Sequence, residues 1–170
     1  YSYDLYNWIK PGGSNMNTMY YDNKIYLRGG ASYGSVSPVM NYSYNGLNWK
    51  STNAYPLMND TYTISSNEDI YVAGGNNNNG SPLYSIIYSY DGKTWYGVSN
   101  SLNLIDNNTS IKIIWNGSIF VCTGTKGSNG DATPIAKSYD GINWETSVSP
   151  TTNTINELNT YTKYISSYNV

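Results

Sequence analysis

A seven-residue motif that occurs four times constrains the fold of this chain more than any other feature. Its consensus is Ser-Tyr-Asp/Asn-x-x-Asn/Thr-Trp, and its copies align without gaps at residues 2–8, 43–49, 89–95 and 138–144. The Trp residues of these copies recur at intervals of about 40 to 50 residues. Repeats of this length indicate a series of equivalent structural units, each of which contains the same turn.

A second motif alternates with the first and completes the unit. It is a turn followed by a short apolar strand that ends in Gly, at residues 23–30, 68–75 and, more loosely, 116–124. A further short strand precedes each copy, at residues 18–21, 62–64 and 111–115. One unit therefore contains strand, polar turn, strand, Gly-rich loop, strand, Asp-Gly turn and strand, which is the order of a four-stranded β-propeller blade.

The sequence thus predicts an all-β chain with one propeller region of four-stranded antiparallel blades over residues 1–170. The expected repeats are 1–16 (partial), 17–59, 60–109, 110–157 and 158–170 (partial). About three complete and two partial blades favour a part of a larger propeller, because known propellers mostly have four to eight blades. The alternative is a four-bladed ring in which the two ends of the chain share the fourth blade.

The residue types of the repeated turn have physical reasons. An Asp or Asn side chain accepts hydrogen bonds from backbone N–H groups two and three residues further on, and the following Gly permits a positive φ. Trp provides a large apolar surface that can pack between neighbouring sheets. We therefore expect a structural role for the motif residues Asp4, Trp8, Asn45, Trp49, Asp91, Trp95, Asp140 and Trp144.

The hairpin Ser-x-Asp-Gly-x-Thr/Asn-Trp resembles the Asp-box (BNR) repeat of sialidase-like and sortilin-like propellers, although the Asp-box has one more residue between Asp and Gly. Residues 70–95, with Gly74-Gly75 at a strand end, are also similar to a kelch repeat with a shortened Tyr–Trp spacing. Repeats this rich in Tyr and Asn further resemble the repeat proteins of large DNA viruses. The resemblance covers nearly the whole chain and implies a propeller of four-stranded blades.

Composition excludes several classes of function. The chain has no His and a single Cys, Cys122, which excludes Ser–His and Cys–His catalysis and His-ligated metal sites. Arg28 is the only Arg, whereas the sialidases that the repeat resembles bind their substrate with several. A net charge of −2 argues against nucleic acid as a partner, and no apolar run is long enough to span a membrane. We expect no enzyme activity and no cofactor.

The predicted binding rim is formed by the loops between the second and third strands of each blade. Asn amides bond to hydroxyl groups and aromatic rings stack on sugars, so these loops suit a glycan or protein ligand. The candidate rim residues are Tyr33, Asn76, Asn77, Asn78, Asn129 and Asp131. We predict no metal site, because one carboxylate at Asp131 is a poor set of ligands for Ca²⁺.

Three functions agree with these features. The first is a non-catalytic binding or structural module, for which a virion or another extracellular surface is favoured over the cytoplasm. The second is a glycan-binding module of a larger secreted glycosidase or adhesin, and the third is a kelch-like intracellular adaptor. The expected partners are a protein or a glycan, without nucleic acid or membrane insertion, and either self-association or more blades from the same parent chain.

Overall fold

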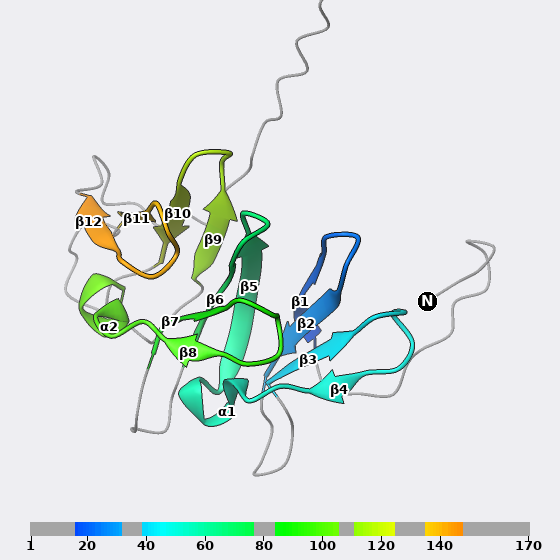
Figure 1. Cartoon of the computed structure of the whole chain (residues 1–170). Coiled ribbons are helices and arrows are strands. Elements are labelled where there is room, and N and C mark those ends of the chain that lie inside the picture. The colour runs from blue at the N-terminus through cyan, green and yellow to red at the C-terminus, as the bar shows by residue number, and fades with distance from the viewer. Residues whose placement is uncertain (1–15, 32–38, 77–83, 106–110, 125–134, 148–170) are drawn as a thin grey trace, which may run out of the picture.

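The structure is a computed structural model that describes residues 16–31, 39–76, 84–105, 111–124 and 135–147. These residues form three four-stranded antiparallel sheets that follow one another along the chain (Figure 1). The prediction of an all-β chain with four-stranded units is therefore confirmed. No helix among the described residues is long and apolar enough to cross a membrane.

Within each sheet the strands pair in chain order. The first sheet contains β1 (Met16–Tyr21), β2 (Tyr26–Gly30), β3 (Met40–Ser43) and β4 (Lys50–Ser51). The second sheet contains β5 (Asp60–Ser66), β6 (Tyr71–Asn76), β7 (Ile86–Ser89) and β8 (Tyr96–Gly97). The third sheet contains β9 (Lys112–Trp115), β10 (Phe120–Thr123), β11 (Ile135–Ser138) and β12 (Glu145–Ser147).

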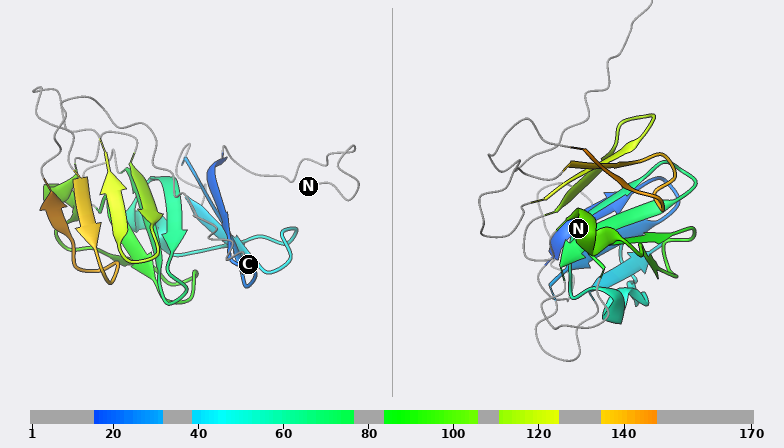
Figure 2. Two further views of the ribbon diagram at one scale, coloured as in Figure 1. Left: turned by 90° about the horizontal axis from the view of Figure 1, so that it is seen from above. Right: turned by 90° about the vertical axis from the view of Figure 1, so that its left-hand side faces the viewer.

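Two apolar clusters fill the spaces between the sheets, which stand in a row with the second sheet in the middle (Figure 2). The cluster between the first and second sheets includes Ile25, Leu27, Met40, Ile64 and Trp95. The cluster between the second and third sheets includes Ile70, Val72, Ile113, Phe120 and Trp144. Each sheet buries its apolar side chains against a neighbouring sheet, so the sheets stabilise one another in sequence.

Both interfaces follow one packing rule. The Trp of a sheet lies in the same cluster as the second strand of the preceding sheet. The turn Gly beside that Trp makes the same contact, because a Cβ added at Gly92 would lie 3.2 Å from Ile25 Cδ1 and Leu27 Cδ2. A Cβ added at Gly141 would lie 2.8 Å from Val72 Cγ2. The repeated turn of one sheet is thus seated on the sheet before it.

The connections between sheets hold this arrangement in register. Each connection contains a four-residue helical turn, α1 (Ala54–Leu57) after the first sheet and α2 (Ser101–Leu104) after the second. Just before α1, Asn53 Oδ1 accepts a hydrogen bond from the Trp95 backbone N–H at 2.7 Å, and Asn53 Nδ2 donates to the Trp95 carbonyl at 3.3 Å. Just before α2, Asn100 Nδ2 donates to the Trp144 carbonyl at 3.4 Å. An Asn at the end of one sheet therefore binds the backbone of the next Trp.

Candidate functional site

The repeated turn between the third and fourth strands is closed by its own side chains. Asp91 Oδ1 accepts hydrogen bonds from the backbone N–H groups two and three residues on, at 2.8 and 2.7 Å. Ser89 Oγ donates to the same oxygen, at 3.0 Å, and accepts from the N–H of Gly92, whose φ is 70°. The Trp95 indole N–H donates to the Gly92 carbonyl at 3.2 Å. Asn45 and Asp140 accept the same two backbone hydrogen bonds in the other sheets, and the indole N–H groups of Trp49 and Trp144 donate to the carbonyl of their turn Gly.

The electrostatics of these turns agree with a structural role. Partial burial of the Asp140 carboxylate favours its neutral form, but hydrogen bonds donated by Asn143, Ile142 and Ser138 outweigh this effect and lower its pKa to about 2. Burial of Asp91 is likewise outweighed by hydrogen bonds from its turn, which lower the pKa of that carboxyl. Both carboxylates are ionised acceptors at neutral pH, and neither is a proton donor.

A second repeated turn joins the first and second strands of every sheet, and sequence analysis did not identify its key residue. Asp22 Oδ1 accepts backbone hydrogen bonds at 2.9 and 3.0 Å from the residues two and three positions on. Asn67 and Asn116 do the same in the other two sheets. The signal in the sequence is an Asp or Asn three residues before Ile25, Ile70 and Ile119.

Asp22 also connects the first two sheets. The Tyr71 hydroxyl donates a hydrogen bond of 2.5 Å to Asp22 Oδ2. Burial favours the neutral carboxyl of Asp22, but this bond and the backbone N–H groups of its turn outweigh burial and lower its pKa. Burial, together with the bond to Asp22, raises the pKa of Tyr71. The pair thus consists of a carboxylate and a neutral phenol at neutral pH.

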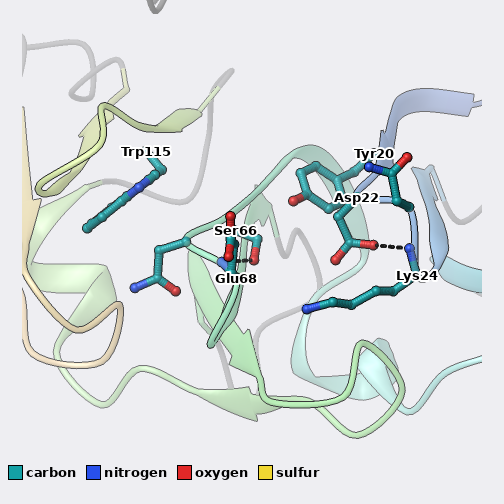
Figure 3. A pocket seen from close by; sticks show the side chains of 8 residues that line it. Tyr20, Asp22, Lys24, Ser66, Glu68 and Trp115 are labelled. Carbon is teal, nitrogen blue, oxygen red and sulfur yellow. Dashed lines mark hydrogen bonds between the residues drawn. The ribbon is translucent and has the colours of Figure 1, made fainter.

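A polar cleft of about 560 Å³ lies beside this contact, and we call it the rim cleft. Figure 3 shows Tyr20, Asp22 and Lys24 on one side, Trp115 on the other, and the turn between β5 and β6 between them. Lys24 extends toward that turn. The lining residues are Tyr20, Asp22, Asn23, Lys24, Ser66, Asn67, Glu68 and Trp115.

Glu68 has an uncommon backbone conformation in the wall of this cleft. Its φ is 80°, in the left-handed region that favours Gly, and its N–H donates to Ser66 Oγ at 3.0 Å. The corresponding residues of the other sheets are Asn23, with φ of 69°, and Gly117, with φ of 97°. Glu is therefore the least suited of the three to this conformation, and strain of this kind is concentrated at functional sites.

The rim cleft combines the groups that bind a polar ligand. Tyr20 and Trp115 are half-buried aromatic rings, while Lys24 and Glu68 are exposed charged side chains. The Asp22 carboxylate already accepts three hydrogen bonds and has a lowered pKa, whereas a general acid needs a raised one. Among the described residues, no group of three or more Cys, Asp or Glu side chains is arranged to hold a metal ion.

The structure places the predicted rim residues elsewhere or leaves them undescribed. Asn76 is the last residue of β6 and only 5% exposed, and its Nδ2 donates to the Tyr62 hydroxyl at 3.5 Å. Its side chain therefore does not face solvent. The other candidates lie outside the described residues, as do two motif residues: Tyr33, Asn77, Asn78, Asn129, Asp131, Asp4 and Trp8.

The rim cleft and the loops that were predicted to bind a ligand lie at opposite ends of the sheets. In an antiparallel sheet, the turn between the first two strands and the loop between the next two lie at opposite ends. The cleft is built on the former, at residues 22–24 and 66–68. Its residues come from three different sheets, and they converge only because the sheets stack.

No family model, no curated protein and no solved structure matches this chain.

Proposed function

We propose that this chain is a non-catalytic interaction module, that its sheets are blades of a β-propeller with Asp-box-like or kelch-like repeats, and that the rim cleft binds its ligand. Three equivalent four-stranded sheets, of which the second and third are each seated on the preceding one through a Trp, support the propeller assignment. Closure of these blades into a ring is also proposed.

One observation carries the non-catalytic assignment. The carboxylates of the repeated turns, and that of Asp22, accept several hydrogen bonds each and have lowered pKa values. A glycosidase needs two carboxyl groups that face each other across the substrate, one of them with a raised pKa. The acidic side chains of these turns instead hold the backbone in place.

The rim cleft favours a glycan as the ligand. Tyr20 and Trp115 provide ring surface on opposite sides of the cleft, and Lys24, Asn67 and Glu68 provide donors and acceptors between them. This composition of two aromatic rings among polar side chains suits a sugar, which has apolar ring faces and hydroxyl groups that donate and accept hydrogen bonds. A protein ligand that inserts a polar side chain is the second candidate, since Lys24 and Glu68 offer both signs of charge.

Titration with oligosaccharides tests the proposal. Chitohexaose, cellohexaose and mannohexaose would be added to the full chain while Trp fluorescence is recorded, with Trp115 as the reporter at the cleft. We expect binding of at least one sugar that weakens by about tenfold in Lys24→Ala and in Glu68→Gln, because each removes a charged hydrogen-bond partner. Lys50→Ala, on the exposed strand β4, is the matched control and should bind as the wild type does.

Assays with 4-nitrophenyl glycosides test the non-catalytic assignment. We expect no release of nitrophenol above the rate of the buffer. Release that is lost in Glu68→Gln would overturn the assignment and make Glu68 a catalytic carboxylate. Binding of no sugar, together with capture of an acidic or basic peptide by the same cleft, would support the protein ligand instead.

A further inference from the structure

The first and third sheets each have one face that is equivalent to a face buried between sheets elsewhere in the chain. On the side toward the preceding sheet, the second sheet buries five side chains: Ile64, Tyr71, Ala73, Ile87 and Trp95. The third sheet buries the equivalent five: Ile113, Phe120, Cys122, Ala136 and Trp144. Strand register assigns the equivalent positions of the first sheet, which we call the leading face: Met19, Tyr26, Arg28, Asn41 and Trp49.

The leading face is not enclosed by any described part of the chain. Met19 is 55% exposed and the neighbouring Tyr21 is 48% exposed, while Trp49 is half-buried. In place of a sheet, the guanidinium of Arg28 lies over the Trp49 ring, 4.5 Å from its centroid. Trp49 and Met19 therefore remain partly exposed, at positions where the second sheet buries Trp95 and Ile64.

On the third sheet, the opposite face is only partly covered by the described residues. On the side toward the following sheet, the first and second sheets place Ile25, Leu27 and Met40 and then Ile70, Val72 and Ile86 in the clusters. The equivalent residues of the third sheet are only half-buried and belong to neither cluster, within the part of the chain that is described. We call them the trailing face: Ile114, Ile119, Val121, Ile135 and Lys137.

We propose that the trailing face of one chain binds the leading face of a second copy, head to tail, with the packing that joins successive sheets within one chain. The turn at Gly46 would then rest on Ile119 and Val121 of the other copy, as the turn at Gly92 rests on Ile25 and Leu27.

A second copy is the occupant because each chain carries both halves of this contact. The internal interfaces show that a trailing face accepts a leading face of the same repeat, and the leading face of the first sheet differs from this pattern at Arg28 and Asn41, which stand where the second sheet buries Ala73 and Ile87. An unrelated partner would need a surface complementary to one of these faces, and the internal interfaces give no such surface except that of the repeat itself. A head-to-tail contact between identical chains closes into a ring or extends into a filament, and two copies would bring six described sheets together.

Sedimentation equilibrium of the full chain tests the proposal, with one substitution on each face. Val121→Arg places a charge in the trailing face and Met19→Arg places one in the leading face, beside Arg28. Each variant alone should dissociate at least tenfold more readily than the wild type, on the order of a hundredfold if the charge stays buried. Ser118→Arg, on the exposed turn beside the trailing face, is the matched control and should associate as the wild type does.

Mixing the two variants gives the decisive result. The Val121→Arg chain keeps its leading face and the Met19→Arg chain keeps its trailing face, so an equimolar mixture should form a one-to-one complex. If the circular dichroism of Val121→Arg differs from that of the wild type, Ile119→Lys replaces it. A wild-type chain that stays monomeric at submillimolar concentration would overturn the proposal. So would association that persists in each variant alone, because it would use another surface.

Discussion

Trp49 and Trp95 occupy the same position of the repeated turn, but their surroundings differ. The indole N–H of each donates to the carbonyl of its turn Gly, at 3.1 Å for Trp49 and 3.2 Å for Trp95. Trp95 is 1% exposed between two sheets, whereas Trp49 is half-buried and lies beneath Arg28. The motif therefore builds its turn without help from a neighbour, and the neighbouring sheet decides how much stability the Trp contributes.

Truncation of the two Trp side chains gives the largest expected effect. Trp95→Ala should lower the free energy of unfolding by about 3–5 kcal/mol, because it leaves a cavity between two sheets. Trp49→Ala should lower it by about 1 kcal/mol, because part of that side chain is already in water. Urea denaturation followed by circular dichroism measures both. Equal losses would mean that the turn, and not the neighbouring sheet, determines the contribution of the Trp.

Substitution of the turn Gly sharpens the comparison. Gly46 has a φ of 71° and Gly141 a φ of 76°, so Ala at either position should cost about 1–2 kcal/mol in backbone strain. The atoms nearest to a Cβ at Gly46 would be those of the Tyr26 ring in its own sheet, at 3.7 Å, whereas the Cβ at Gly141 would meet Val72 of the preceding sheet at 2.8 Å. Gly141→Ala should therefore cost about 1 kcal/mol more than Gly46→Ala in the same urea assay.

Arg28 allows a smaller test on the first sheet alone. Its guanidinium lies over Trp49 and its Nε donates to Asn41 Oδ1 at 3.2 Å. Arg28→Ala gives the first sheet the residue that the second sheet has at Ala73. We expect a loss of about 0.5–1 kcal/mol from the cation–π contact, together with quenching of Trp49 fluorescence by added iodide. No change in quenching would show that Arg28 does not shield the ring.

The smallest effect is expected at the turn carboxylate, and it depends on pH. The pKa of Asp140 is lowered to about 2, so its contribution to stability is present above its ordinary pKa near 3.8 and is lost as the pH falls through the folded value. Asp140→Asn should change stability little at neutral pH, because the side chain is exposed and because Asn45 already closes the equivalent turn of the first sheet. The variant should lose less stability than the wild type between about pH 5 and pH 2.

The repeated turns could be predicted from sequence because their chemistry is local. Asp91 and Gly92 act within a few residues of one another, so hydrogen-bond acceptor, positive φ and Trp all appear in one short motif. The four-stranded unit follows from the spacing of these motifs. Trp95 and Trp144 lie buried in the clusters between sheets, whereas Trp49 lies in neither cluster, since no described sheet precedes its own.

The rim cleft could not be predicted because its residues meet only through packing. Tyr20, Glu68 and Trp115 belong to three different sheets, and their proximity depends on how each sheet is rotated against the next. The contact between Tyr71 and Asp22 has the same origin, since it spans two sheets. The turn signal at Asp22 and Asn67 was present in the sequence, but an Asx residue before an apolar strand is too common to indicate a site by itself.

The Asn residues that bind the next Trp have a consequence for how such a chain can change in length during evolution. A duplicated segment that runs from Asn53 to Asn100 would bring its own Asn, its own turn and its own Trp. The copy would add one new junction, in which Val72 and Ile86 of one unit face Ile64 and Tyr71 of the next, by the same packing rule as in the existing interfaces. Duplication or deletion within the coding sequence can therefore lengthen or shorten this protein by whole units.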